Sequence, residues 1–157
     1  MPRHVQSSHL IVVDMPADQC FMLFTPAGEE LWVEGWRPEY IHPADGRTVA
    51  GMVFTTGAGK DGEESTVWTL ADFDREQRRS RYVRCTPGSR TGFVEVRCRA
   101  LDGARTEVVV SYTLTALSAA GEKVLEGFEG ERFAAMIDGW GAEIATQRES
   151  LLQAEIR

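Results

Sequence analysis

Apolar and polar residues alternate most clearly in the second half of the chain. In residues 105–117, one side of an extended strand is polar and the other carries Val108, Val110, Tyr112 and Leu114. Residues 92–101 alternate in the same way. We therefore expect each strand to turn one side to a core and the other to water, as in an antiparallel sheet with one solvated face.

The same pattern predicts a whole series of strands. Six strand-like segments follow one another, at residues 39–43, 49–56, 64–72, 79–85, 92–101 and 105–117. Turn formers separate several of them, at 44–46 (ADG), 57–62 (GAGKDG), 87–89 (PGS) and 102–104 (DGA). Connections this short join antiparallel neighbours. A further strand at residues 8–13 brings the expected sheet to seven strands.

Helices are predicted on either side of this β-rich region. Residues 17–24 favour one short helix, and Thr25 followed by Pro26 favours the start of a second, because Thr caps helices and Pro tolerates the first helical position. Residues 122–155 repeat apolar side chains at steps of three and four, which predicts one long amphipathic helix. The expected α+β order is β-α-α-β6-α, in a single domain spanning residues 1–157.

Composition and net charge limit the classes of binding partner and the compartment that we expect for this protein. The 157 residues carry a formal net charge of −7, which disfavours binding to nucleic acid or to anionic lipid. No apolar run approaches the ~20 residues of a membrane span, and the N-terminus lacks a signal-peptide pattern. The three cysteines, Cys20, Cys85 and Cys98, are widely spaced, so we expect reduced thiols. These features predict a cytoplasmic protein, monomeric or homodimeric, without a metal or other cofactor.

The chain resembles the START-like helix-grip superfamily (SRPBCC), most closely its short bacterial members of uncharacterised activity. Four segments carry the resemblance: residues 25–40 (TPAGEELWVEGWRPEY), 72–88, 116–122 (ALSAAGE) and 133–144 (FAAMIDGWGAEI). The superfamily includes pollen allergens, lipid-transfer domains and polyketide cyclases. The resemblance implies a curved sheet that grips the last helix, with a cavity between them. None of the four segments is a catalytic signature, so the resemblance indicates fold more than chemistry.

Side chains on the dry side of the sheet and helix are the candidates for lining this cavity. They are Trp32, Trp36, Phe54, Trp68, Tyr82, Arg84, Tyr112, Phe133, Met136, Ile137 and Trp140. Periodicity alone does not separate core residues from pocket-lining residues. Tyr82, Tyr112 and Arg84 form a set that could orient the polar end of an apolar ligand; alternatively, Arg84 emerges at the end of the sheet and pairs with glutamate or solvent.

The segment before the first of the six strands contains two tryptophans and an ambiguous acid. A helical turn through residues 29–36 places Trp32 and Trp36 on one side, where we expect them to close the joint between helix and sheet. Such a plug can also form part of a cavity wall. Glu29 shares this apolar side. The favoured interpretation is an exposed carboxylate at a helix start, and the alternative is a semi-buried acid with a raised pKa, suited to acid–base work.

Three functions are consistent with this pattern. The first is binding of a small or medium hydrophobic molecule, such as a lipid, a polyketide or an aromatic metabolite, in the internal cavity. The alternative is an enzyme resembling polyketide cyclases or dehydratases that uses the same cavity. The second alternative is a chaperone-associated protein-interaction module, which predicts an exposed apolar patch. Hydrolase and metalloenzyme are disfavoured, because neither a GxSxG elbow nor a metal-binding His/Cys set is present.

Overall fold

The computed structural model describes residues 3–57 and 64–157 of the chain. Its strands are β1 (His4–Val13), β2 (Glu39–His42), β3 (Val53–Thr56), β4 (Thr66–Asp74), β5 (Arg79–Thr86), β6 (Arg90–Ala100) and β7 (Thr106–Ala116). Its helices are α1 (Ala17–Met22), α2 (Pro26–Glu29), α3 (Ala119–Leu125), the short 3₁₀ helix η1 (Glu126–Phe128), α4 (Gly130–Thr146) and α5 (Arg148–Gln153). Most of the turn predicted at 57–62 lies outside the described residues.

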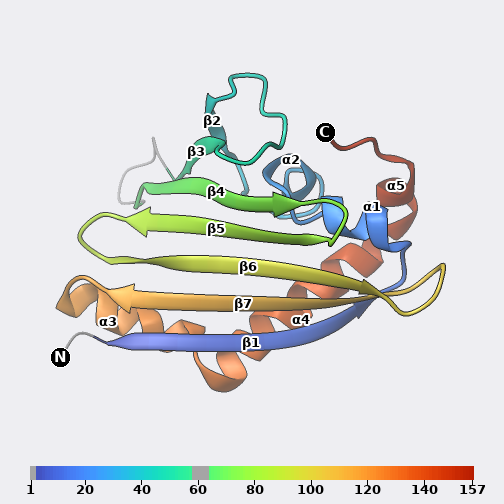
Figure 1. Cartoon of the computed structure of the whole chain (residues 1–157). Helices are drawn as coiled ribbons and strands as arrows, with labels where there is room; N and C mark the ends of the chain where they lie inside the picture. The colour runs from blue at the N-terminus through green and yellow to red at the C-terminus, as the bar shows by residue number, and fades with distance from the viewer. Residues whose placement is uncertain (1–2, 58–63) are drawn as a thin grey trace.

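The seven strands form one antiparallel sheet in the order β1-β7-β6-β5-β4-β3-β2. Figure 1 shows α4 crossing behind the sheet and α1 and α2 at one end of it. This arrangement confirms the predicted helix-grip fold with its order of one strand, two short helices, six strands and C-terminal helices. No helix among the described residues has the length and hydrophobicity needed to cross a membrane.

Alternation in β6 and β7 behaves as the sequence predicts. Every second residue of β7 from Thr106 to Ala116 is buried, and the intervening residues remain half-exposed. At the β6–β7 pairing, Gly92 permits an unusually close approach. A Cβ atom on Gly92 would lie 1.8 Å from the carbonyl oxygen of Thr113, so only glycine lets the two strands come this close at that point.

Strand β1 begins earlier than predicted. It starts at His4 and pairs with β7 from Thr115 onwards, whereas the sequence pattern indicated residues 8–13. Its first half is polar except for Val5, which is 5% exposed. Pairing with β7 thus orders a segment whose own hydrophobic pattern is too weak to predict a strand.

The single long helix predicted over residues 122–155 is divided into α3, η1, α4 and α5. The first break lies at Glu129 and Gly130. Glu129 is extended (φ −119°, ψ 150°), and Gly130 has a φ of 53°, in the left-handed region that favours glycine. A second break at Gln147 separates α4 from α5. The 17 residues of α4 therefore cover about 25 Å, less than the predicted helix.

A tight joint between α1 and α2 positions the segment that follows. The backbone N–H of Gly28 donates to Oγ1 of Thr25 at 3.1 Å, which caps α2 as predicted. A Cβ atom on Gly28 would lie 2.0 Å from the carbonyl oxygen of Met22, so the joint requires glycine.

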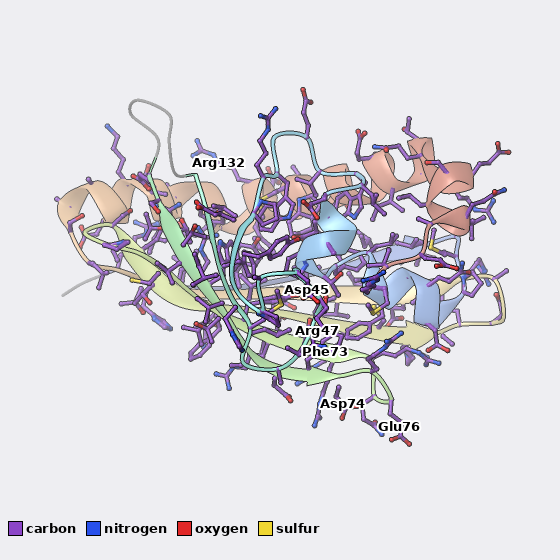
Figure 2. The ribbon with its side chains drawn as sticks, turned by 90° about the horizontal axis from the view of Figure 1, so that it is seen from above. Asp45, Arg47, Phe73, Asp74, Glu76 and Arg132 are labelled. Carbon is purple, nitrogen blue, oxygen red and sulfur yellow. The ribbon has the colours of Figure 1, made fainter. Side chains whose placement is uncertain are left out.

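Figure 2 shows α1 and α2 between the sheet and the C-terminal helices, with Asp74 and Glu76 pointing away at the β4–β5 turn. Residues 30–35 then continue as turns and a bend, so the helical turn predicted through residues 29–36 does not extend beyond α2.

Candidate functional site

A cavity of about 130 Å³ lies between the sheet, the 29–36 segment and α4. Its walls are mostly aromatic and aliphatic, and consist of Phe24, Glu29, Val33, Trp36, Phe54, Trp68, Tyr82, Arg84, Val94, Val96, Tyr112 and Trp140. The strand residues of this wall are buried, whereas Val33, Trp36 and Trp140 are half-buried. The cavity therefore reaches solvent on the side formed by the 29–36 segment and α4.

The predicted candidates divide into two groups. The cavity wall contains Glu29, Trp36, Phe54, Trp68, Tyr82, Arg84, Tyr112 and Trp140. Outside the wall lie Trp32, Phe133, Met136 and Ile137. The inward side of a helix or strand contains both core and cavity positions, which is why the sequence pattern grouped them together.

The two tryptophans of the 29–36 segment have different positions. Trp32 is 3% exposed, and its indole N–H donates to the carbonyl of Leu23 at 2.8 Å. Its ring meets that of Trp140 edge-on, with centroids 6.0 Å apart, so Trp32 supports the wall from behind. Trp36 donates to the carbonyl of Pro26 at 3.0 Å and turns its ring into the cavity wall. Both indoles are thus tied to backbone carbonyls of the α1–α2 region.

On α4, the residues before Trp140 complete the core beside the cavity. Phe133 and Ile137 are 1% and 0% exposed. The ring of Phe133 packs edge-on against that of Tyr112, with centroids 5.2 Å apart. Met136 is partly buried against the same core. These three side chains belong to the core or pack against it, and Trp140 is the α4 side chain that reaches the cavity.

Three aromatic rings from neighbouring strands form the most regular part of the wall. Phe54 of β3 and Trp68 of β4 are register partners, and their rings stack with centroids 5.7 Å apart and an interplanar angle of 5°. Tyr82 of β5 meets both rings edge-on, at 6.4 and 6.1 Å. The indole N–H of Trp68 donates to Oγ1 of Thr56 at 3.0 Å. Packing and hydrogen bonding together hold this face in one arrangement.

Arg84 places a cation in the otherwise aromatic wall. The residue is 8% exposed, and its guanidinium lies 4.7 Å from the ring centroid of Trp68. Burial lowers the pKa of Arg84, and the nearby Tyr112 opposes this effect. Arginine nevertheless remains charged in proteins. The alternative in which Arg84 emerges at the end of the sheet is therefore wrong, because strand parity turns its side chain inward together with Tyr82.

Glu29 is also part of the wall, so the favoured interpretation as an exposed carboxylate is wrong. It is the last residue of α2 rather than the first, and its side chain lies against the cavity. Part of the residue remains accessible, as expected at a cavity that opens to solvent, but protein surrounds the carboxyl group and raises its pKa well above the usual range. Burial therefore favours the protonated form of the Glu29 carboxyl group.

The two wall tyrosines differ in their hydroxyl partners. The hydroxyl of Tyr82 donates to the carbonyl of Phe24 at 3.1 Å. Burial raises the pKa of Tyr82, and the nearby Glu29 adds to this effect. Burial raises the pKa of Tyr112 to about 12, against the opposing effect of Arg84. Both hydroxyl groups are therefore protonated at neutral pH, and that of Tyr82, which already donates to Phe24, can only accept a further hydrogen bond.

Four wall residues were missed among the sequence candidates. Val94 and Val96 share one strand parity, so the alternation in β6 could have identified both. Phe24 and Val33 lie in the α1–α2 joint and in the turns after α2, where no periodic pattern fixes the direction of a side chain.

No family model and no curated protein matches this chain. Solved structures do match it. Norcoclaurine synthase from Thalictrum flavum, in complex with dopamine and hydroxybenzaldehyde, superposes with a TM-score of 0.63 at 14% identity over 92% of this chain and 88% of that chain. Ara h 8.0201 gives 0.65 at 14% identity, with 97% and 100% covered. Zhui aromatase/cyclase from Streptomyces sp. R1128 gives 0.56 at 20% identity, with 97% and 90% covered.

These similarities extend over almost the full length of each chain. They confirm the predicted resemblance to START-like helix-grip proteins at the level of the fold. At sequence identities of 14–20%, these structural similarities show a shared fold and do not show a shared function.

Proposed function

We propose that this protein binds a small hydrophobic molecule, about the size of one substituted aromatic ring, in the cavity walled by Trp36, Phe54, Trp68 and Trp140. The observation that carries the proposal is the cavity itself, which is enclosed on most sides by aromatic side chains and contains few polar groups. The three free cysteines fit a reducing compartment such as the cytoplasm.

The cavity volume selects the size of the ligand. An engineered apolar cavity of about 150 Å³ binds benzene, whereas pockets for drug-sized ligands occupy roughly 300–1,000 Å³. At about 130 Å³, the present cavity suits a single ring. A lipid or a multi-ring polyketide, both within the range expected from the sequence, would require the 29–36 segment to move outward.

The apolar wall also sets an approximate affinity. An aromatic side chain buries about 150–250 Å² in a protein interior, and a bound ring of similar size gains about 4–6 kcal/mol at ~25 cal/mol per Å². This free energy corresponds to a Kd between about 1 mM and 30 μM. Titrations therefore have to reach millimolar probe concentrations.

Known structures of the same fold support a ligand of this kind. The matching norcoclaurine synthase structure contains dopamine and hydroxybenzaldehyde, two single-ring compounds. A protein-interaction module receives less support from the described residues. Their exposed large apolar side chains are distributed over several strands and loops, and are Leu10, Val12, Leu31, Ile41, Val49, Val67, Leu101 and Leu117.

Tryptophan fluorescence provides a direct test, because three of the four tryptophans, Trp36, Trp68 and Trp140, line the cavity. We expect benzyl alcohol, a neutral single-ring probe, to change the emission saturably and to give matching heats in calorimetry. A linear response without saturation up to millimolar concentrations, together with absent heats, would contradict the proposal.

A reaction at the cavity is a second candidate, favoured by the position of Glu29. A protonated carboxyl group in an apolar cavity can donate a proton to a substrate carbonyl, as an enzyme that promotes enolisation or dehydration requires. The test is deuterium exchange at the α-carbons of phenylacetone in D₂O, followed by NMR. Exchange faster with the wild type than with Glu29→Gln supports this candidate; equal rates for both proteins and buffer remove it.

A further inference from the structure

Arg84 differs from the other arginines whose side chains are partly withdrawn from solvent. The described residues include three arginines with a buried Nε that lacks a hydrogen-bond partner, namely Arg3, Arg84 and Arg90. Arg3 forms an ion pair with Glu129. Arg90 forms one with Glu64 at 2.6 Å and also donates to Oγ of Ser89 at 2.9 Å. The side chain of Arg84 has neither an ion pair nor a hydrogen bond within the described ranges.

Neither Glu64 nor Glu29 forms an ion pair with Arg84. Glu64 favours the charged form of Arg84 but is paired with Arg90. Glu29 belongs to the same cavity wall, yet the two side chains form no salt bridge. Burial also raises the pKa of Glu29, which disfavours the charged carboxylate that an internal counterion would require. The ring of Trp68 faces the guanidinium and offsets part of its desolvation, but a ring face does not accept the in-plane N–H groups of arginine.

The position of the guanidinium allows it to meet a guest. On β5, Arg84 lies opposite Trp68 of β4 and opposite Gly92 of β6, which has no side chain that could cover it. Its charge is thus held at the cavity wall beside stacked aromatic rings. A buried charge is favourable when it is paired and hydrogen-bonded, and the rigid fork of arginine matches the two oxygens of a carboxylate.

We infer that the ligand is a monocyclic aromatic acid bound as its anion, with the carboxylate accepting hydrogen bonds from the guanidinium of Arg84 and the ring packed against Trp36 and Trp68. The inference rests on the proposed function and specifies the ligand of the same cavity. The acid supplies the counterion that Arg84 lacks among the described residues. A neutral ring fills the same apolar space but leaves the guanidinium unpaired.

Matched probes test the charge requirement without any mutation. Phenylacetate and phenylacetamide have nearly the same shape, and only the first is an anion. We expect calorimetry on the wild-type protein to give at least a tenfold lower Kd for phenylacetate. In Arg84→Met this preference should disappear, so that phenylacetate and phenylacetamide bind with Kd values within about threefold of each other. Arg81→Met is the matched control, because Arg81 lies on the same strand with an exposed side chain paired to Glu95, and should retain the preference.

Each outcome has a distinct meaning. If benzyl alcohol binds while phenylacetate and phenylacetamide bind equally to the wild type, the inference is wrong and the proposed function stands. If none of the three probes binds, the proposed function fails with it. Should Arg84→Met not fold, as judged by circular dichroism, Arg84→Gln takes its place. A preference for phenylacetate that persists in a folded Arg84 variant would also overturn the inference.

Discussion

Filling the cavity is the perturbation whose effect depends most directly on the interior being hollow. Val96 lines the cavity and is 3% exposed. Its register partner on β7, Val110, is 0% exposed and lies outside the cavity wall. Val96→Phe and Val110→Phe therefore add the same atoms at adjacent positions, one facing a void and the other facing packed core.

The expected difference follows from volume and area. A void of about 130 Å³ costs about 3 kcal/mol at ~24 cal/mol per Å³ when compared with a fully packed interior. Phenylalanine adds about four carbon atoms to valine, worth about 3 kcal/mol at ~0.8 kcal/mol per buried group, as an upper limit. Incomplete filling and rotamer restriction reduce the gain, so we expect Val96→Phe to stabilise by about 1 kcal/mol. Overpacking in Val110→Phe should cost about 1–3 kcal/mol.

Chemical and thermal unfolding measure both effects. For a chain of this length, a gain of about 1 kcal/mol raises the Tm of Val96→Phe by roughly 2–4 °C, and Val110→Phe should lower it. Val96→Phe should also lose the binding of benzyl alcohol. If Val96→Phe destabilises the protein as much as Val110→Phe does, the interior is solid and the argument from the cavity is refuted.

Three further substitutions test individual features. Glu29→Gln should raise the free energy of unfolding at neutral pH, because the raised folded-state pKa of Glu29 makes wild-type stability fall as the pH rises above the unfolded value of about 4.3. The gain should therefore vanish in denaturant titrations below about pH 4. A gain independent of pH would refute this assignment. Tyr82→Phe should cost about 1–2 kcal/mol in urea unfolding, because the buried carbonyl of Phe24 loses its donor, and an unchanged midpoint would contradict that bond. Gly130→Ala should cost about 1–2 kcal/mol through its positive φ, whereas Gly127→Ala, the control, should not; equal effects would argue against backbone strain.

The sheet was predictable where alternation is strong and uninterrupted. Residues of β6 and β7 show period two because one face is dry, and the structure follows that pattern. The polar first half of β1 has no such signal and is ordered by pairing with β7. The break between η1 and α4 was signalled by two glycines, Gly127 and Gly130, but the surrounding helical periodicity outweighed them in the prediction.

The site was predictable in part for the same reason. Strand parity placed Arg84 beside Tyr82 on the inner face, because side chains of a strand alternate strictly. It did not show that Arg84 lacks an internal partner, since that depends on contacts between distant segments. The environment of Glu29 depends on how the turns after α2 fold back, which no periodicity describes. The cavity volume is the difference between the enclosed space and the volume of all the side chains that fill it. No single segment of the sequence therefore predicts it.

A crystal structure in complex with bromobenzene tests the central claim most directly, because the anomalous signal of bromine locates the guest independently of the protein map. The account predicts a bromine peak inside the cavity, in van der Waals contact with Trp36 or Trp68, and no peak there in Val96→Phe crystals. A cavity occupied by water alone at saturating bromobenzene, or by shifted side chains that leave no space, would contradict the claim that this fold encloses room for a ligand.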